Sequence, residues 1–269
     1  ATGTFGIACI AEDAANELYV VNTESGVLSR IIDGSASVKL SPRMALEGPF
    51  VQASGLMNDG LRAAGLVPLT EPYTTSLGFS KVAKGGGEVI AASILATTGN
   101  NAVVDWVRVE LRSAAQPSMI AAVDGTSPLT FRVGSGTYHV VVRHRNHFGC
   151  MTTSPLALTN TASAVDFRAS TTLTYGSGAR KSIGTVQALW AGNALLDASL
   201  RYVGASNDRD PILARIGGAV PTASATGYHL EDVNLDGTVK YTGANNDREP
   251  ILVNIGGSTP TAVLTQQLP

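Results

Sequence analysis

A tandem repeat near the C-terminus constrains the fold of this chain more than any other feature of its sequence. Residues 202–222 read YVGASNDRDPILARIGGAVPT and residues 241–261 read YTGANNDREPILVNIGGSTPT, which are identical at 14 of 21 positions. A spacing of 39 residues is typical of a supersecondary unit that buries its apolar face against a neighbouring copy. We therefore expect a C-terminal region, 179–269, that holds two copies of one structural unit at about 190–222 and 229–261.

Each copy predicts a polar loop followed by a short helix. An acid and a proline open the helical segment, as Asp210-Pro211 in the first copy and Glu249-Pro250 in the second. Both residue types suit the first turn of a helix. The Ile-Leu-x-x-Ile pattern that follows gives the helix one apolar face, and the Gly-Gly pair after it is typical of a helix end.

The loop of the second copy has the spacing of a calcium site. Residues 232–239 read DVNLDGTV, which is the Asp-x-Asn-x-Asp-Gly pattern of an EF-hand-type loop. Such a loop also needs a carboxylate at position 12, where this chain has Gly243, and Asp247 lies four residues later. The predicted ligands of Ca²⁺ in the second loop are Asp232, Asn234, Asp236, the carbonyl oxygen of Thr238, and Asp247.

The loop of the first copy is degenerate. The same spacing places Asn193, Leu195 and Asp197 at positions 1, 3 and 5, and Asp208 corresponds to Asp247. Ligand number and charge set the affinity for calcium. We therefore predict a weaker calcium site at Asn193, Asp197 and Asp208, and the alternative is a copy that packing alone stabilises.

The chain before the repeat is predicted to be mainly β, because short apolar and polar runs alternate between turn-forming residues. We expect an N-terminal β segment at 1–45 and a β-sandwich of immunoglobulin-like or transthyretin-like type at 46–178. The spacing around Gly134 and Gly136 predicts a β-hairpin. Trp106, in an alternating strand, is predicted to lie in the core.

The composition favours an extracellular protein. Charged residues make up 15% of the chain, against about a quarter in an average protein, while glycine is abundant at 29 residues. With a net charge of −2 and no basic stripe, nucleic acid is not an expected partner. No apolar run reaches the roughly 18 residues that a membrane span needs. Cys9 and Cys150 form either one disulfide or two buried free thiols.

No set of residues in the sequence predicts catalysis. His139, His144 and His147 are close in sequence, but residues three apart on a strand face opposite sides and converge only through a turn. We interpret them as part of an ordinary strand-and-turn surface rather than a metal site. Nucleophile-elbow and phosphate-loop motifs are absent from the sequence, and its acidic residues are scattered. The prediction is that the chain is not an enzyme.

Several of these segments resemble a known group of proteins. The repeated NDRDPIL and NDREPIL, each followed by IGG, resemble the C-terminal region of large secreted Bacteroidota proteins, as do GLMNDGLRAAGLVPLTEPY and YHVVVRHRNHFGCMT. Those proteins are cell-surface and adhesin-like, of the type exported by the type IX secretion system. The resemblance covers about residues 40–269 and implies a cell-surface location and dockerin type I-like repeats.

The functional hypothesis is an extracellular structural or adhesive surface protein, a candidate filament subunit, stabilised by Ca²⁺ in its C-terminal repeat. Self-association into a fibre or surface assembly would use residues 1–45 as a donor or edge strand. The alternative is a dockerin-like docking or carbohydrate-binding module of a larger secreted enzyme system, with a protein or glycan ligand.

Overall fold

The computed structural model describes residues 7–12, 18–22, 28–30, 36–77, 79, 86–113 and 128–269. Over these residues the chain is mainly β and forms several small sheets, none of which closes into a barrel. The prediction of a mainly-β fold is therefore confirmed.

The helices of the described residues are all short, and the elements follow one another along the chain in this order. The strands are β1 Ile7–Glu12, β2 Leu18–Asn22, β3 Leu28–Arg30, β4 Val38–Arg43, β5 Phe50–Val51, β6 Leu56–Met57, β7 Arg108–Arg112, β8 Leu129–Phe131, β9 Gly136–Arg143, β10 Cys150–Met151, β11 Leu156–Leu158, β12 Ser163–Asp166, β13 Lys181–Ile183, β14 Val186–Ala188, β15 Ser199–Arg201, β16 Ser224–Thr226, β17 Thr238–Lys240 and β18 Val263–Thr265. The helices are α1 Gly60–Ala63, α2 Pro72–Thr75, α3 Ala92–Leu95, the 3-10 turn η1 Gly99–Asn101, α4 Arg209–Arg215 and α5 Arg248–Asn254.

Two sheets form the body of the molecule. In one, β9 pairs with β7 along one edge and with β10 and β11 along the other. In the second, β4 lies between β12, which runs parallel to it, and β8, which runs antiparallel. Alternate residues of these strands point into one shared core, because side chains of a strand alternate between its faces. That core includes Val38, Leu40, Val109, Leu111, Phe131, Val140, Val142 and Leu158.

Two predictions for the body have different outcomes. Trp106 lies in the core, 4% exposed, as predicted. The prediction of a hairpin at Gly134 and Gly136 is wrong, because β8 pairs with β4 while β9 belongs to the other sheet. The turn therefore carries the chain from one sheet to the other.

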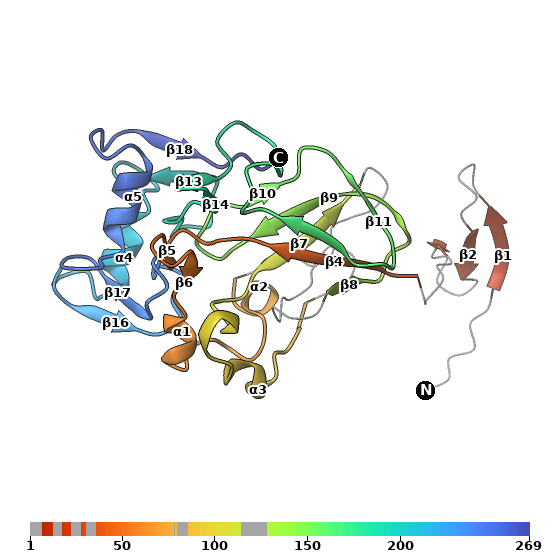
Figure 1. Ribbon diagram of the computed structural model, residues 1–269, viewed down its shortest axis with the longest axis horizontal. Helices are drawn as coiled ribbons and strands as arrows, with labels where there is room; N and C mark the ends of the chain where they lie inside the picture. Colours follow the sequence, from red (N-terminus) through yellow and green to blue (C-terminus); the bar gives the residue numbers. More distant parts are fainter. Residues whose placement is uncertain are drawn as a thin grey trace.

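The N-terminal strands form a sheet of their own. Strands β1, β2 and β3 pair antiparallel in sequence order, and Figure 1 draws β1 and β2 beyond one end of the body. The strand β4 also falls within the 1–45 segment, but it is the central strand of a sheet of the body.

The two C-terminal copies have the same elements in the same places. β15, α4 and β16 each recur 39 residues later as β17, α5 and β18, and the predicted helices are confirmed. The strand pairing crosses between the copies, since β15 pairs with β18 and β16 with β17. A second core joins them and includes Leu200, Ile212, Val239 and Ile251. Figure 1 shows the repeat at the end of the body opposite to β1 and β2.

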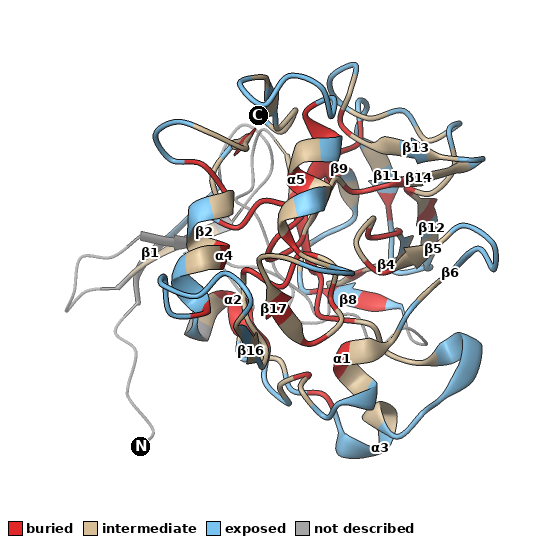
Figure 2. Ribbon diagram, turned by 90° about the vertical axis from the view of Figure 1, so that its left-hand side faces the viewer, coloured by how far each residue is buried: buried red, intermediate tan, exposed pale blue. Residues whose placement is uncertain are grey.

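The repeat presents the outer faces of its helices to solvent. Figure 2 shows buried residues behind α4 and α5 and exposed residues on their outer turns. In the residues that the structure describes, no helix is both long enough and apolar enough to cross a membrane.

Candidate functional site

The second loop curls around the side chains that the sequence predicts as ligands. Asp232 accepts hydrogen bonds from the backbone N–H of Asp236 (3.2 Å) and of Gly237 (2.9 Å). Asn234 Oδ1 also accepts from the N–H of Asp236 at 2.9 Å, and Asp236 Oδ1 accepts from that of Thr238 at 2.9 Å. Gly237 has φ of +86°, so the sharp turn needs a residue without a Cβ. The predicted ligands therefore lie on one tightly wound segment.

Asp247 closes this loop from the start of α5. Its Oδ1 accepts from the backbone N–H of Val233 at 2.9 Å, and its Oδ2 accepts from that of Lys240 at 2.8 Å. The side chain is fully buried. The four-residue displacement from position 12 thus still brings the Asp247 carboxylate against the loop.

Burial makes the charges of these aspartates costly. It raises the pKa of Asp247 to about 8, and the nearby Asp232 carboxylate adds to the effect. Burial also raises the pKa of Asp232 to about 6, despite the charge of Arg145. Two buried carboxylates that repel each other are an arrangement that a bound cation would relieve.

The first loop repeats this arrangement with fewer charges. Asp208 accepts from the N–H of Leu195 (3.2 Å) and of Arg201 (2.9 Å), as Asp247 does in the second copy, and burial raises its pKa to about 7. Asn193 bonds the backbone of Asp197 through both its amide oxygen and its amide nitrogen. The structure therefore brings the three predicted side chains to one loop, where amide–backbone bonds replace one carboxylate.

Neither loop gathers a metal site from acidic side chains alone. In the described part of the chain, no three side chains of His, Cys, Asp or Glu are grouped so that they could hold a metal ion. The predicted set in the second loop also contains the amide oxygen of Asn234 and the carbonyl oxygen of Thr238, both of which are ligand types that Ca²⁺ takes.

The second loop is also packed against the body. Leu235, in the middle of the loop, has φ of +60° and lies in the core of the body together with Leu61. A Cβ on Gly48 would lie 2.2 Å from the carbonyl oxygen of Val233. The Asn146 side chain donates to the carbonyl oxygen of Asp232 at 2.6 Å. The position of the loop is therefore set by the buried Leu235 side chain, by the Asn146 amide and by close backbone packing at Gly48.

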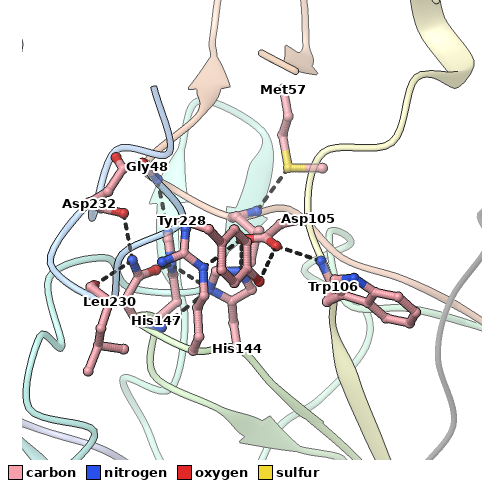
Figure 3. A network of polar contacts seen from close by, with 12 residues as sticks. Gly48, Met57, Asp105, Trp106, His144, His147, Tyr228, Leu230 and Asp232 are labelled. Carbon is pink, nitrogen blue, oxygen red and sulfur yellow. Dashed lines mark hydrogen bonds and ion pairs between the residues drawn. The ribbon is translucent and has the colours of Figure 1, made fainter. Parts of the chain in front are cut away.

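A buried polar network lies at this junction (Figure 3). Asp105 accepts from Arg145 Nε at 2.8 Å, from Tyr228 Oη at 2.7 Å and from His144 Nε2 at 3.1 Å. Arg145 also donates to the carbonyl oxygen of His229 and stacks on the Tyr228 ring, 4.2 Å from its centroid. Burial opposes the Asp105 charge, but Arg145 and these hydrogen bonds outweigh it and hold the pKa of Asp105 well below its usual range.

The interpretation of the histidines as a surface is wrong for His144 and His147. Both are buried, and their rings meet edge to face with centroids 4.8 Å apart. They converge because β9 ends at Arg143, so strand geometry no longer separates them. Burial lowers the pKa of both, so both are neutral at pH 7. Figure 3 shows them between Gly48 and Asp105.

The ring nitrogens of these two histidines have protein partners. His147 Nε2 accepts from the N–H of Gly48 at 3.1 Å, which leaves its proton on Nδ1, beside Asn146 Oδ1 (2.8 Å) and His144 Nδ1 (3.1 Å). His144 then donates from Nε2 to Asp105. The pair therefore relays hydrogen bonds across the junction, which is a structural role. The sequence signal for it was the polar run RHRNH after an apolar strand.

The two cysteines do not form the disulfide considered from the sequence. Cys150 is a free and fully buried thiol, and burial raises its pKa to about 12. The side chain of Cys9 lies outside the described residues.

Comparisons with known proteins find no match for this chain. Its sequence matches no protein-family description and no curated protein, and its structure matches no solved structure. The residues and geometry of the chain itself therefore carry the functional inference.

Proposed function

We propose that the chain is an extracellular structural or adhesive surface protein whose dockerin-like tandem binds Ca²⁺ and is held rigidly on a β-sandwich body. Two sheets around one core support a sandwich of immunoglobulin-like or transthyretin-like type. Two equivalent loop-and-helix units, each pairing a strand with the other, support the dockerin-like tandem.

The observation that carries calcium binding is the full burial of Asp232 and Asp247 around one loop. The ligands would be Asp232, Asn234, Asp236, the Thr238 carbonyl oxygen and Asp247. Calcium would supply the positive charge that balances these buried carboxylates, and its binding energy would add to the stability of the folded state. The first loop, with Asn193, Asp197 and Asp208, would bind more weakly.

Calorimetric titration of the chelator-treated chain with CaCl₂ tests the site. We expect one strong site in the wild-type chain and its loss in Asp232→Ala. Asp210→Asn is the matched control, because Asp210 is an exposed acid of the first copy and should leave the strong site intact. A wild-type chain that takes up no Ca²⁺ would contradict the proposal.

The structural role is supported by how the tandem is attached. Its second loop, its helix α5 and its last residues all contact the body, including a hydrogen bond from Gly149 to Gln266 at 2.8 Å. Such a unit transmits force without a flexible joint. Self-association through the 1–45 segment would give a fibre or a surface assembly.

Negative-stain electron microscopy of the purified chain, with Ca²⁺ and with chelator, tests assembly. Filaments that fray in chelator, and that disappear when residues 1–20 are deleted, support the structural proposal. Discrete particles in both conditions contradict it.

The alternative, a carbohydrate-binding or docking module, is favoured by a groove beside the second loop. The groove has a volume of about 450 Å³ and is lined by polar side chains, including Asn58, Asn234 and Asn246. Amides of this kind can bond to sugar hydroxyls. A glycan array probed with the soluble chain tests this reading, and binding that is lost in Asn58→Ala would support it.

A further inference from the structure

A lysine, a glutamate and an asparagine from three distant segments meet where α5 contacts the body. Lys181 Nζ lies 2.6 Å from Asn254 Oδ1 and 2.5 Å from Glu47 Oε1. Asn254 Nδ2 donates to Glu47 Oε2 at 2.7 Å and to the carbonyl oxygen of Ala191 at 2.9 Å. An amine, an amide and a carboxylate therefore touch one another in pairs.

The surroundings hold these three groups in place. Asn254 is 8% exposed, and the side chains of Glu47 and Lys181 are 12% and 24% exposed. The Trp190 ring flanks Lys181, with its centroid 5.5 Å from Nζ, and the backbone N–H of Ala191 donates to Glu47 Oε2 at 2.9 Å. The amide is oriented by bonds on both its oxygen and its nitrogen.

The repeat loses its internal symmetry at this point. The residue that corresponds to Asn254 in the first copy is Arg215, whose guanidinium pairs with Glu231 at 3.0 Å on a more exposed surface. The asparagine therefore occurs in the copy whose helix meets Lys181 and Glu47. The repeat by itself does not require an amide at this position.

We propose that Lys181 and Asn254 form an intramolecular amide crosslink, with Glu47 as the proton-transferring group. Lysine amines act as nucleophiles at carbonyl carbons when a neighbouring base removes a proton. Here Nζ would attack Cγ of Asn254, so that the Nζ–Cγ bond forms and the Cγ–Nδ2 bond breaks. Two of the three ammonium protons pass to Nδ2, which leaves as ammonium, and no oxidant or reductant is needed.

The position of Glu47 fits both proton transfers. One carboxylate oxygen contacts the attacking nitrogen and the other contacts the leaving nitrogen, so a proton taken at Oε1 is matched by a proton given at Oε2. The fold holds Nζ in hydrogen-bond contact with the Asn254 amide oxygen, one bond from Cγ, which lowers the entropy cost of bringing the amine and the amide together. Glu47 also lines the polar groove described above, which gives ammonium a way out to solvent.

The crosslink would fasten the C-terminal repeat to the body. It joins residues that are 73 apart in sequence and ties α5 to the β13–β14 hairpin. Such a bond restricts the unfolded chain and resists force along the molecule. This inference goes beyond the proposed function and does not depend on calcium.

Intact-mass spectrometry of the full wild-type chain tests the crosslink directly. We expect a mass lower than that of the sequence by about 17 Da, the mass of the ammonia lost when the amine displaces the amide nitrogen. Tryptic digestion should then give the peptide 181–201 joined to 249–269, because trypsin does not cut after an acylated lysine. A wild-type chain with the full sequence mass, cut by trypsin after Lys181, overturns the proposal whatever any variant does.

Three variants define the roles of the residues. Lys181→Arg and Asn254→Ala should restore the full mass, and Glu47→Gln should slow or abolish the loss of ammonia. Lys39→Arg is the control, because Lys39 lies in β4 among the strands of the body, and it should keep the crosslinked peptide. If circular dichroism shows that the Glu47→Gln chain is folded and it still crosslinks at the wild-type rate, Glu47 does not transfer protons in the reaction.

Discussion

Three buried aspartates, Asp208, Asp232 and Asp247, determine how the C-terminal repeat responds to protons. Burial raises the pKa of each above the value of about 3.9 that an aspartate has in an unfolded chain. The folded state therefore holds protons that the unfolded state has released. Without a metal, this contribution to stability is complete at low pH and is lost as pH rises through the folded pKa values.

The first prediction is that the metal-free chain becomes less stable as pH rises from about 6.5 to about 8, because Asp247 and, up to about pH 7, Asp208 keep protons in the folded state that the unfolded chain has released. The buried histidines act in the opposite direction, but His144 and His147 have lowered pKa values and stop contributing above about pH 6.5. Calcium replaces the protons, so the rise in Tm on adding Ca²⁺ should grow with pH. Thermal unfolding in chelator and in CaCl₂ measures both trends, and a rise that shrinks with pH would contradict them.

The second prediction concerns Gly48, where the body touches the second loop. A Cβ there would lie 2.2 Å from the carbonyl oxygen of Val233, and because the clash is with backbone atoms, no side chain can rotate away to relieve it. Gly48→Ala should cost about 3 kcal/mol of unfolding free energy, as overpacking does. Gly134→Ala is the control, because a Cβ there meets open space, and it should change stability by less than about 0.5 kcal/mol. Urea unfolding compares the two variants.

Strands and helices of the repeat depend on each other across the two copies. Each helix has seven residues, which is too short to be stable alone in water. The helix α5 contacts β15 of the other copy, and α4 contacts β17. Because the pairing is reciprocal, neither copy has a complete core without the other.

The third prediction follows at this scale. Leu200 of β15 is fully buried and packs in one core with Ile251 of α5, so Leu200→Ala should cost roughly 2–5 kcal/mol. Hydrogen exchange should speed up in both copies, including β17 and α5. Val220→Ala, at an exposed position, should leave exchange unchanged. Faster exchange confined to the first copy would show that the copies are independent.

Local sequence patterns predicted some of these elements but not how the strands pair. The two short helices were predictable, because an acid, a proline, an apolar face and a Gly-Gly end all lie within one segment. The partners of β8 and β9 were not, since two strands separated by a short glycine turn can pair with each other or join different sheets. Which choice is made depends on β4, a strand about 90 residues earlier in the chain.

At the scale of the whole molecule, body and repeat share one interior. Leu235 of the repeat lies in the core of the body, and the Asp105–Arg145–Tyr228 network joins the two below the surface. Asp105 and Arg145 belong to the body, while the Tyr228 hydroxyl and the carbonyl oxygen of His229 come from the C-terminal region, so separating the two parts would leave buried polar groups without these hydrogen bonds. We expect them to unfold together.

The fourth prediction tests this cooperativity with two tryptophans. Trp106 lies in the core of the body and Trp190 packs against the core of the repeat. Chains that keep one tryptophan, made by Trp190→Phe or Trp106→Phe, should each show one transition, coincident with that measured by circular dichroism on the same chain. Calcium should raise Tm for both reporters, and a shift seen by Trp190 alone would mean that the repeat unfolds separately.

The sequence by itself determined the repeat, its two loop-and-helix units and the side chains that line each loop, because these depend on spacing within about 40 residues. Tertiary structure alone decided what those units are joined to. The contacts of Asp105 with Arg145 and Tyr228, and the meeting of Lys181 with Glu47 and Asn254, unite segments far apart in the chain. Such contacts leave no local periodicity, because packing of the whole core, rather than the pattern of one element, places their side chains together.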